Sequence, residues 1–317
     1  MVYLLLVLGF VLVIKGADWL VDGASSLAKR LKVSDLAIGL TVVAFGTSMP
    51  EFVVNIFSSL NKTPEIAIGN ILGSNIANTF LILGVAAIIY PIAVQKKTTW
   101  KEIPFSLLAA AVVGILANDV FFGGGTVSSL SRGDGLILIA FFIIFMYYTF
   151  GSCQDTGEQP ETSVKEMGLL KALVLILVGL VCLSLGGNWI VEGAIKFAQM
   201  LGVSASLIGL TVVAVGTSLP ELVTSAVAAW KKNSDIAIGN VVGSNIFNIF
   251  WVLGASAIIY PLPFSPANSF DVLMVVFASL VLFVIMFIGK KHTIQRWQGV
   301  TMILLYVAYI SFLVYRG

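Results

Sequence analysis

Long apolar segments separated by short polar turns run through almost the whole chain. Segments of membrane-spanning length lie at residues 2–28, 36–60, 65–90, 103–121, 133–150, 168–199, 206–230, 236–260, 270–289 and 298–315. Because about 20 apolar residues cross the hydrocarbon core of a bilayer as a helix, this pattern predicts ten transmembrane helices. Hydrophobic residues make up 58% of the chain and charged residues only 11%, whereas soluble domains carry about 25% charged residues. The sequence therefore predicts an all-α integral membrane protein.

Two parts of the chain repeat each other. Residues 39–91 align without a gap with residues 209–261, and the similarity extends upstream of both segments. Equivalent positions are separated by five predicted spans, an odd number, so the second copy enters the membrane from the opposite face. We therefore expect two inverted-topology five-helix repeats, with broken helices and a site near the membrane midplane. The expected parts are a first half at 1–150, a short cytoplasmic linker at 151–166 and a second half at 167–317.

Basic residues gather in alternate loops, which gives an orientation. Most lysines and arginines fall near residues 29–32, 96–101, 165–171, 231–232 and 290–296. The positive-inside rule assigns these loops to the cytoplasm, so we expect a multi-pass cell-membrane protein with both termini extracellular. The net charge of +2 gives no reason to expect nucleic acid as a partner. The lipid bilayer is the expected environment, and no feature indicates an obligatory protein partner.

Two acidic residues stand near the middle of predicted spans, Glu51 and Glu221. Each ends the same motif, Gly-Thr-Ser-x-Pro-Glu, at 46–51 and 216–221. A carboxylate in lipid costs on the order of several kcal/mol, and no basic residue is found at midspan to pair with either one. Two unpaired carboxylates in a dry site repel each other unless a proton or a bound cation neutralises the charge. The duplicated context favours a cation site over two protonated, merely hydrogen-bonded acids.

The remainder of this motif supplies oxygen atoms. Pro50 and Pro220 each remove a helical donor, and the resulting breaks are expected to free nearby backbone carbonyls. Thr47 lies four residues before Glu51, on the same helical face. Hard cations prefer hydroxyl, carbonyl and carboxylate oxygens, and no Cys or His accompanies them to favour softer metals. The oxygen-bearing candidates besides the acids are Thr47, Ser48, Thr217, Ser218 and the carbonyls of Ala44 and Ala214.

A second duplicated motif occupies the third and eighth predicted spans, at 69–78 and 239–248. Ser74 and Asn78 are four residues apart and share a helical face, as do Ser244 and Asn248. The glycines of the motif allow close helix approach, and they suggest a second helix interruption near the midplane. The other amides of the motif are expected to support the site: Asn70, Asn75, Asn240 and Asn245.

The number and charge of these oxygens bear on which ion fits. Ca²⁺ takes roughly six to eight oxygen ligands, which two carboxylates, two threonines and a water or two can supply. The two negative charges of the glutamates balance Ca²⁺. Monovalent ions can instead use one carboxylate each, together with serine, carbonyl and amide oxygens. The residues alone leave the driving ion open.

The duplicated Gly-Thr-Ser-x-Pro-Glu and Gly-Ser-Asn-x-x-Asn segments resemble the α-repeats of the Na⁺/Ca²⁺ exchanger family of the cation/Ca²⁺ antiporter superfamily, in its prokaryotic ten-helix form. The resemblance covers the whole chain and implies Ca²⁺ coordination by Glu51, Glu221, Thr47 and Thr217. It implies Na⁺ coordination by Ala44, Ser48, Glu51, Ser74, Asn78, Ala214, Ser218, Glu221, Ser244 and Asn248. The asparagine at position 248 resembles the residue found in K⁺-independent members of the family. The resemblance implies Na⁺ and Ca²⁺ as transported ions and no cofactor.

The expected function is secondary active antiport of Na⁺ against Ca²⁺ by alternating access, electrogenic and K⁺-independent, and not catalysis. The first and sixth spans are the expected moving pair. Their glycines at 16, 23, 186, 187 and 193 would permit sliding. A Ca²⁺/H⁺ antiporter is the alternative of the same class, and a cation channel is the alternative of another class. No paired residues of a hydrolase motif support an enzyme.

Overall fold

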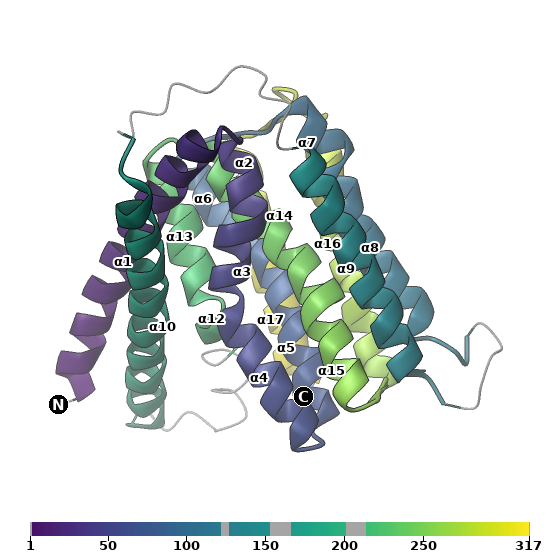
Figure 1. Ribbon diagram of the computed structural model, residues 1–317. Helices are drawn as coiled ribbons and strands as arrows, with labels where there is room; N and C mark the ends of the chain where they lie inside the picture. Colours follow the sequence, from purple (N-terminus) through teal and green to yellow (C-terminus); the bar gives the residue numbers. More distant parts are fainter. Residues whose placement is uncertain (1, 122–126, 153–165, 201–213, 317) are drawn as a thin grey trace.

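The computed structural model describes residues 2–121, 127–152, 166–200 and 214–316, and within them the chain forms a bundle of helices (Figure 1). The helices of the first part are α1 (Val2–Leu31), α2 (Asp35–Ile38), η1 (Gly39–Val43), α3 (Ala44–Thr47), α4 (Met49–Leu60), α5 (Pro64–Ile76), η2 (Ala77–Ile82), α6 (Leu83–Ile89), α7 (Lys96–Trp100), α8 (Glu102–Leu116) and α9 (Arg132–Ser152). Those of the second part are α10 (Leu169–Met200), α12 (Ala214–Thr217), α13 (Leu219–Trp230), α14 (Ser234–Ile246), η4 (Phe247–Leu253), α15 (Gly254–Ile259), α16 (Pro266–Ile285) and α17 (Arg296–Arg316). The helical fold and its apolar spans confirm the predicted class of membrane protein.

Seven of the described helices are long and apolar enough to cross a membrane, and an eighth candidate is a bent pair. The bent pair joins Asp35–Thr47 to Met49–Leu60 at an angle of 47°. This confirms the helix break expected at Pro50. The predicted span at 206–230 begins outside the described residues, and α1 is not among the seven although it has 30 residues. The count of ten spans stays a prediction.

Two spans form the centre of the bundle. In Pro64–Ile89 and in Ser234–Ile259, 78% of the most apolar 18-residue stretch is buried, against 22–39% in the other five. Both run without a break through their duplicated glycines and continue as π-helical turns, η2 and η4. The expected interruption at these glycines is therefore wrong for the described spans. Gly243 serves close packing instead, because a Cβ there would lie 2.7 Å from the Leu40 carbonyl oxygen of η1.

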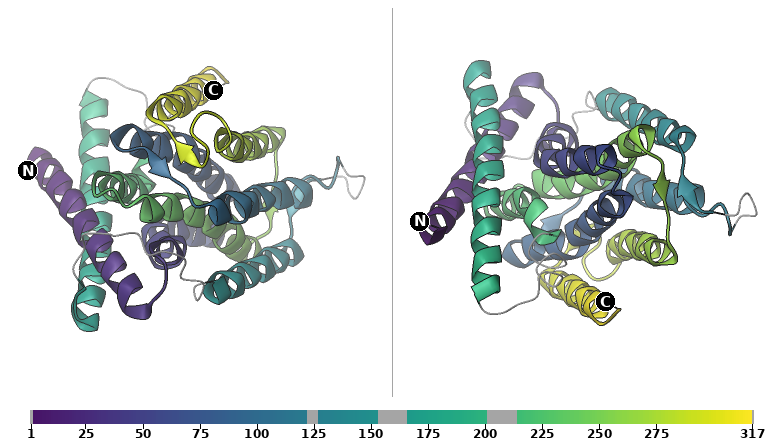
Figure 2. Two further views of the ribbon diagram at one scale, coloured as in Figure 1. Left: turned by 90° about the horizontal axis from the view of Figure 1, so that it is seen from above. Right: turned by 90° about the horizontal axis from the view of Figure 1, so that it is seen from below.

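The helices α1 and α10 pack against each other at one edge of the bundle, where they cross in the views of Figure 2. Gly9 faces the Gly186 carbonyl and Gly16 faces the Gly179 carbonyl, and an added Cβ on either glycine would lie 2.8 Å from the oxygen. Because the earlier glycine of α1 meets the later glycine of α10, the two helices run antiparallel. Their backbones are too close for any larger side chain at these positions.

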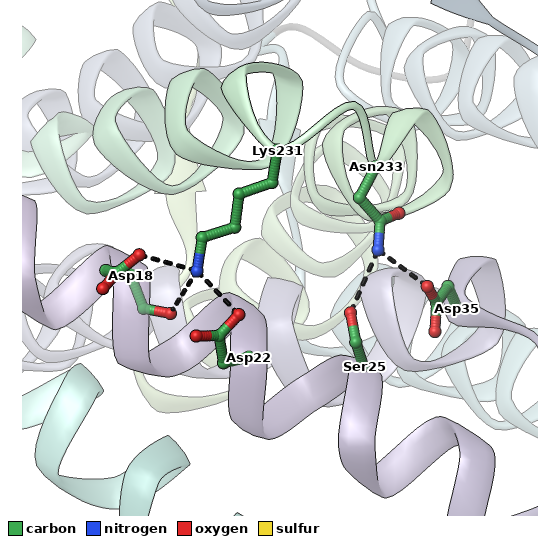
Figure 3. A network of polar contacts seen from close by, with 6 residues as sticks. All are labelled: Asp18, Asp22, Ser25, Asp35, Lys231 and Asn233. Atoms are coloured by element: carbon green, nitrogen blue, oxygen red, sulfur yellow. Dashed lines mark hydrogen bonds and ion pairs between the residues drawn. The ribbon is translucent and has the colours of Figure 1, made fainter. Parts of the chain in front are cut away.

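One end of α1 is attached to α13 by charged and polar side chains (Figure 3). The Lys231 ammonium lies 2.6 Å from Asp18 Oδ1 and 2.7 Å from Asp22 Oδ1. The Asn233 amide donates to Ser25 Oγ at 3.0 Å and to Asp35 Oδ2 at 2.7 Å. Asp18 and Asp22 thus have the basic partner that helix-end charges need, supplied by the other half of the chain.

Two short antiparallel ladders also join the halves of the sequence. β1 (Ile92–Ala93) pairs with β4 (Thr293–Ile294), with Ile92 opposite Ile294. β2 (Ser129–Leu130) pairs with β3 (Leu262–Pro263), with Leu130 opposite Leu262. Each ladder takes one strand from the first half and one from the second, so loops that are distant in sequence are held together.

Candidate cation site

Glu51 and Glu221 occupy equivalent places at the start of two helices. Each lies in the first turn of its helix, α4 or α13, three residues after an N-cap serine whose backbone leaves the helical conformation. Ser48 has φ −82° and ψ 6°, and Ser218 has φ −88° and ψ 8°. Both glutamate side chains are fully or almost fully buried. A helix N-terminus stabilises negative charge through its unpaired N–H groups, so the break places each carboxylate where its charge is best tolerated.

Serine hydroxyls link each glutamate to the other half of the chain. Ser48 Oγ donates to Glu221 Oε1 at 3.0 Å, and Ser218 Oγ donates to Glu51 Oε1 at 3.2 Å. Ser74 Oγ lies 3.4 Å from Glu51 Oε1 and 3.2 Å from Ser218 Oγ. The structure therefore brings the two duplicated motifs into one buried hydrogen-bonded cluster, as the repeat predicted.

The two threonines of the motif are each held by an asparagine of the other half. Thr47 Oγ1 donates to Asn240 Oδ1 at 3.0 Å, and Thr217 Oγ1 donates to Asn70 Oδ1 at 3.5 Å. The amide nitrogen of each asparagine in turn donates to a glutamate backbone carbonyl at 3.3 Å, Asn70 to Glu51 and Asn240 to Glu221. Asn70 and Asn240 thus each contact a threonine of one motif and the glutamate backbone of the other, while their support role stays a prediction.

The carbonyl of Ala44 departs from the sequence expectation. It accepts the Ser48 N–H at 3.0 Å and also lies 3.4 Å from Thr47 Oγ1, so the break does not free it. The physical reason is that the helix continues through Thr47 and leaves the helical conformation only at Ser48. Ala214 opens α12, the equivalent short helix of the second half.

Four asparagines form a second cluster where the central spans meet. Asn78 Nδ2 donates to Asn245 Oδ1, and Asn248 Nδ2 donates to Asn75 Oδ1, both at 3.1 Å. Asn75 and Asn245 thereby fix which way the other two amides point. Asn78 and Asn248 lie in the π-helical turns η2 and η4, a helix variant that is frequent at functional sites.

Several buried oxygens at the centre have no hydrogen-bond partner among the described residues: Glu51 Oε2, Glu221 Oε2, Asn78 Oδ1, Asn248 Oδ1 and Ser244 Oγ. Leaving a buried polar atom unpaired costs about 1–3 kcal/mol. All five are oxygens, and two belong to carboxylates. A hard cation satisfies such a set, whereas softer metals favour sulfur or imidazole ligands. Within the described part of the chain no group of three or more His, Cys, Asp or Glu side chains could hold a metal.

Sequence analysis did not assign a further set of polar residues that adjoin the cluster. They are Asn55, Thr79, Ser225 and Ser256, all buried. Asn55 accepts a hydrogen bond from Asn70 at 2.7 Å, and Ser225 accepts one from Asn240 at 2.9 Å. Asn55 and Ser225 lie four residues after the two glutamates, so their polarity on the glutamate face of an apolar helix is the signal that could have identified them.

The fold and the site define a multi-pass membrane protein with a buried, oxygen-lined centre that matches the needs of a hard cation. A family model described as sodium/calcium exchanger protein matches residues 1–151 and 171–315. This chain therefore belongs to the sodium/calcium exchanger family, as its duplicated motifs predicted.

Individual relatives agree with this assignment over nearly their full lengths. The sodium/calcium exchanger MaX1 of Methanosarcina acetivorans is 34% identical, across 99% of this chain and 98% of its own. The inner membrane protein YrbG of Escherichia coli is 36% identical over 87% of this chain and 86% of its own. A solved structure of the sodium-calcium exchanger NCX_Mj is 35% identical and superposes with a TM-score of 0.84, covering 98% of this chain and 99% of that one.

Proposed function

We propose that this protein is a secondary antiporter that exchanges Na⁺ for Ca²⁺ across the membrane, with no cofactor. The observation that carries the proposal is the reciprocal pairing of the two halves. Ser48 donates to Glu221, and Ser218 donates to Glu51, which leaves the second oxygen of each carboxylate unpartnered within the described residues. Two converging carboxylates give the charge that balances one divalent cation.

The proposed ligands follow from this geometry and from the family. Ca²⁺ is coordinated by Glu51, Glu221, Thr47 and Thr217. The proposed Na⁺ ligands are Ser48, Ser74, Asn78, Ser218, Ser244 and Asn248, the two glutamates and the carbonyls of Ala44 and Ala214. For Ala44, an ion would take the place of the 3.4 Å contact with Thr47 Oγ1. The two ion types share the glutamates, so they compete for one centre.

Charge neutralisation explains how binding is coupled to movement. When Na⁺ or Ca²⁺ is bound, its positive charge offsets that of the two carboxylates, so little net charge is buried in the low-dielectric interior. The empty site keeps two uncompensated buried charges, which cost a large amount of free energy. The protein with bound ions therefore reorients its site from one side of the membrane to the other, and the empty protein does not. Exchange of several Na⁺ for one Ca²⁺ moves net charge, so transport responds to voltage. Asn248 supports independence from K⁺.

The proposed topology has ten spans in two inverted halves, 1–150 and 167–317, joined by a cytoplasmic linker at 151–166, with both termini outside. The antiparallel packing of α1 and α10, which start the two halves, supports it. The two helices are joined to each other through bare glycine backbones and meet the bundle through side chains such as Leu180 against Gly46, which makes the pair the proposed moving element.

Uptake of radiolabelled Ca²⁺ into proteoliposomes tests the proposal. An outward Na⁺ gradient at clamped pH, with K⁺ present or absent, is expected to drive uptake equally in both cases. Uptake that ignores Na⁺ and follows a proton gradient would identify a Ca²⁺/H⁺ antiporter instead. Leakage of Ca²⁺ down its own gradient without counterflow would identify a channel.

A further inference from the structure

The side chain of Asn55 connects the candidate site to the core behind it. It is completely buried, one helical turn beyond Glu51 in α4. Its amide nitrogen donates to the Ala67 carbonyl at 3.1 Å and to Ser256 Oγ at 3.2 Å. Its oxygen accepts a hydrogen bond from Asn70 Nδ2 at 2.7 Å. Asn55 therefore contacts α5 and α15 as well as an asparagine of the site.

These contacts fix the direction of the Asn55 amide. Ser256 donates its single proton to the Val252 carbonyl at 2.8 Å, so toward Asn55 it can only accept. The Ala67 carbonyl can also only accept. The nitrogen of Asn55 must face these two acceptors, and its oxygen must face Asn70.

The oxygen of Asn55, together with the more distant Glu51 carbonyl, fixes the direction of the Asn70 amide. With its nitrogen directed to Asn55 Oδ1 and to the Glu51 carbonyl, Asn70 presents its oxygen to Thr217. Thr217 then donates its only proton to Asn70, which leaves the lone pairs of Thr217 Oγ1 for a cation. The Thr217 contact is 3.5 Å long, and a reversed Asn70 amide would present donors to Thr217 in place of the accepting oxygen.

The surroundings of Glu221 lack this arrangement. Ser225 occupies the position equivalent to Asn55, and Ala86 occupies the position equivalent to Ser256. Asn240 donates to Ser225 Oγ at 2.9 Å, but a hydroxyl can both donate and accept, so only the Glu221 carbonyl, at 3.3 Å, fixes the direction of this amide. The Thr47 contact with Asn240 is the shorter one, at 3.0 Å.

We propose that Asn55, backed by Ser256, is a positioning residue for the Ca²⁺ site that acts through Asn70 on Thr217. The proposal rests on the proposed function, because Thr217 is a ligand only if the site binds Ca²⁺. The competing account is that Asn55 merely joins α4 to its neighbours. The two accounts differ in whether the effect of Asn55 depends on Thr217.

A double-mutant cycle separates them. Ca²⁺ affinity is measured in the purified full-length protein by calorimetry, and KM and maximal rate are measured in proteoliposomes. The variants are Asn55→Ala, Thr217→Val and their combination, with Asn55→Ala plus Thr47→Val as the matched control from the other half. The effects of two substitutions on Ca²⁺ affinity are coupled when the residues touch or act through a shared neighbour. The effects of substitutions at independent sites add.

Asn55→Ala is expected to weaken Ca²⁺ binding and to raise KM by about fivefold, the effect of about 1 kcal/mol, with the maximal rate within about twofold. In the Thr217→Val background Asn55→Ala is expected to have almost no further effect, whereas in the Thr47→Val background its fivefold effect remains. Asn55→Ser, which copies Ser225 and leaves a hydroxyl that does not fix the direction of the Asn70 amide, is expected to lose nearly as much. Ser256→Ala, which copies Ala86, is expected to weaken binding by about twofold.

Equal effects of Asn55→Ala in both threonine backgrounds, or an unchanged Ca²⁺ affinity, would overturn the positioning role. If Asn55→Ala does not fold, the cycle is run with Asn55→Ser and Ser256→Ala together. Calorimetry keeps this test separate from the proposed function. Intact Ca²⁺ binding without Na⁺-driven uptake removes the exchange activity and leaves the cycle valid, whereas a wild-type protein that binds no Ca²⁺ refutes both.

Discussion

The two halves of this protein are nearly equal at the candidate site and unequal behind it. Each half contributes one glutamate, one threonine and one serine that bonds across to the partner glutamate. Behind Glu51, Asn55 of the first half bonds to Ser256 of the second half, whereas behind Glu221 the equivalent positions hold Ser225 and Ala86. The difference teaches that the charge at the centre requires both copies, while the groups that orient the ligands are free to diverge. The predictions below test how far this equality extends.

The largest effect is expected for Glu51→Gln and Glu221→Gln. Because the proposed site places one cation between both carboxylates, removing either charge is expected to lower Ca²⁺ uptake by about 100-fold or more, consistent with the cost of breaking a buried charge pair. The measurement is the initial rate of radiolabelled Ca²⁺ uptake, with gel filtration as the control for folding. Near-wild-type exchange in one of the two variants would show that the halves are not equal at the centre.

Substitution of the glycines at the contact between α1 and α10 is expected to slow the conformational change of transport by about tenfold, because overpacking costs on the order of 1–3 kcal/mol. The Ca²⁺ affinity is expected to stay within about twofold. Gly16→Val and Gly186→Val are the equivalent changes in α1 and α10, and a Cβ at either meets a backbone carbonyl oxygen at 2.8 Å. Gly151→Val is the matched control, because nothing lies within 4 Å of a Cβ there. Uptake rate and calorimetric affinity are compared. A similar rate loss in the control would remove the role assigned to this contact.

Ser74→Ala is expected to reduce Na⁺ dependence more than Ca²⁺ affinity, by about fivefold against less than twofold, which is the scale of one hydrogen bond to a charged group. Ser74 lies within hydrogen-bond distance of Glu51 and Ser218, whereas Ser244 has no partner among the described residues. The Na⁺ concentration for half-maximal exchange is measured for Ser74→Ala and Ser244→Ala. Equal loss for both ions in Ser74→Ala would contradict separate Na⁺ and Ca²⁺ roles.

The smallest effect is expected at the end of α1. Lys231→Asn copies Asn61, the equivalent residue of the first half, and removes the partner of Asp18 and Asp22. Because both carboxylates are more than a third exposed, the loss is expected to be under about 1 kcal/mol, a fall in the thermal midpoint of about 2 °C. Thermal unfolding at low and high salt checks it, since screening removes the difference. A fall that is unchanged in high salt would contradict an ion-pair origin.

The sequence predicted the helical membrane fold, the helix break near Pro50, and the pairing of the two motifs. These depend on local rules: apolar length, a proline in a helix, and the spacing of side chains on one face. The duplication supplied the one long-range relation, because two copies of a buried acid need the same ion.

Contacts that depend on the relative position of packed helices could not be predicted from the sequence. Lys231 as the partner of Asp18, and Asn240 as the partner of Thr47, require the relative depth of helices from different halves. The Ala44 carbonyl was wrongly expected to be free, because proline fixes the existence of a break but not the residue at which the preceding helix ends.

The two strand ladders have a consequence for the order of synthesis. β1 and β2 leave the ribosome early, but their partners β4 and β3 lie in the second half of the chain, with β4 close to its end. Until those strands are made, the backbone groups of β1 and β2 lack their strand partners. Asn70 likewise lacks the hydrogen bond from Thr217 until the second half is made. The first half can thus enter the bilayer as helices, but it reaches its final tertiary structure only after β3 and β4 have been made.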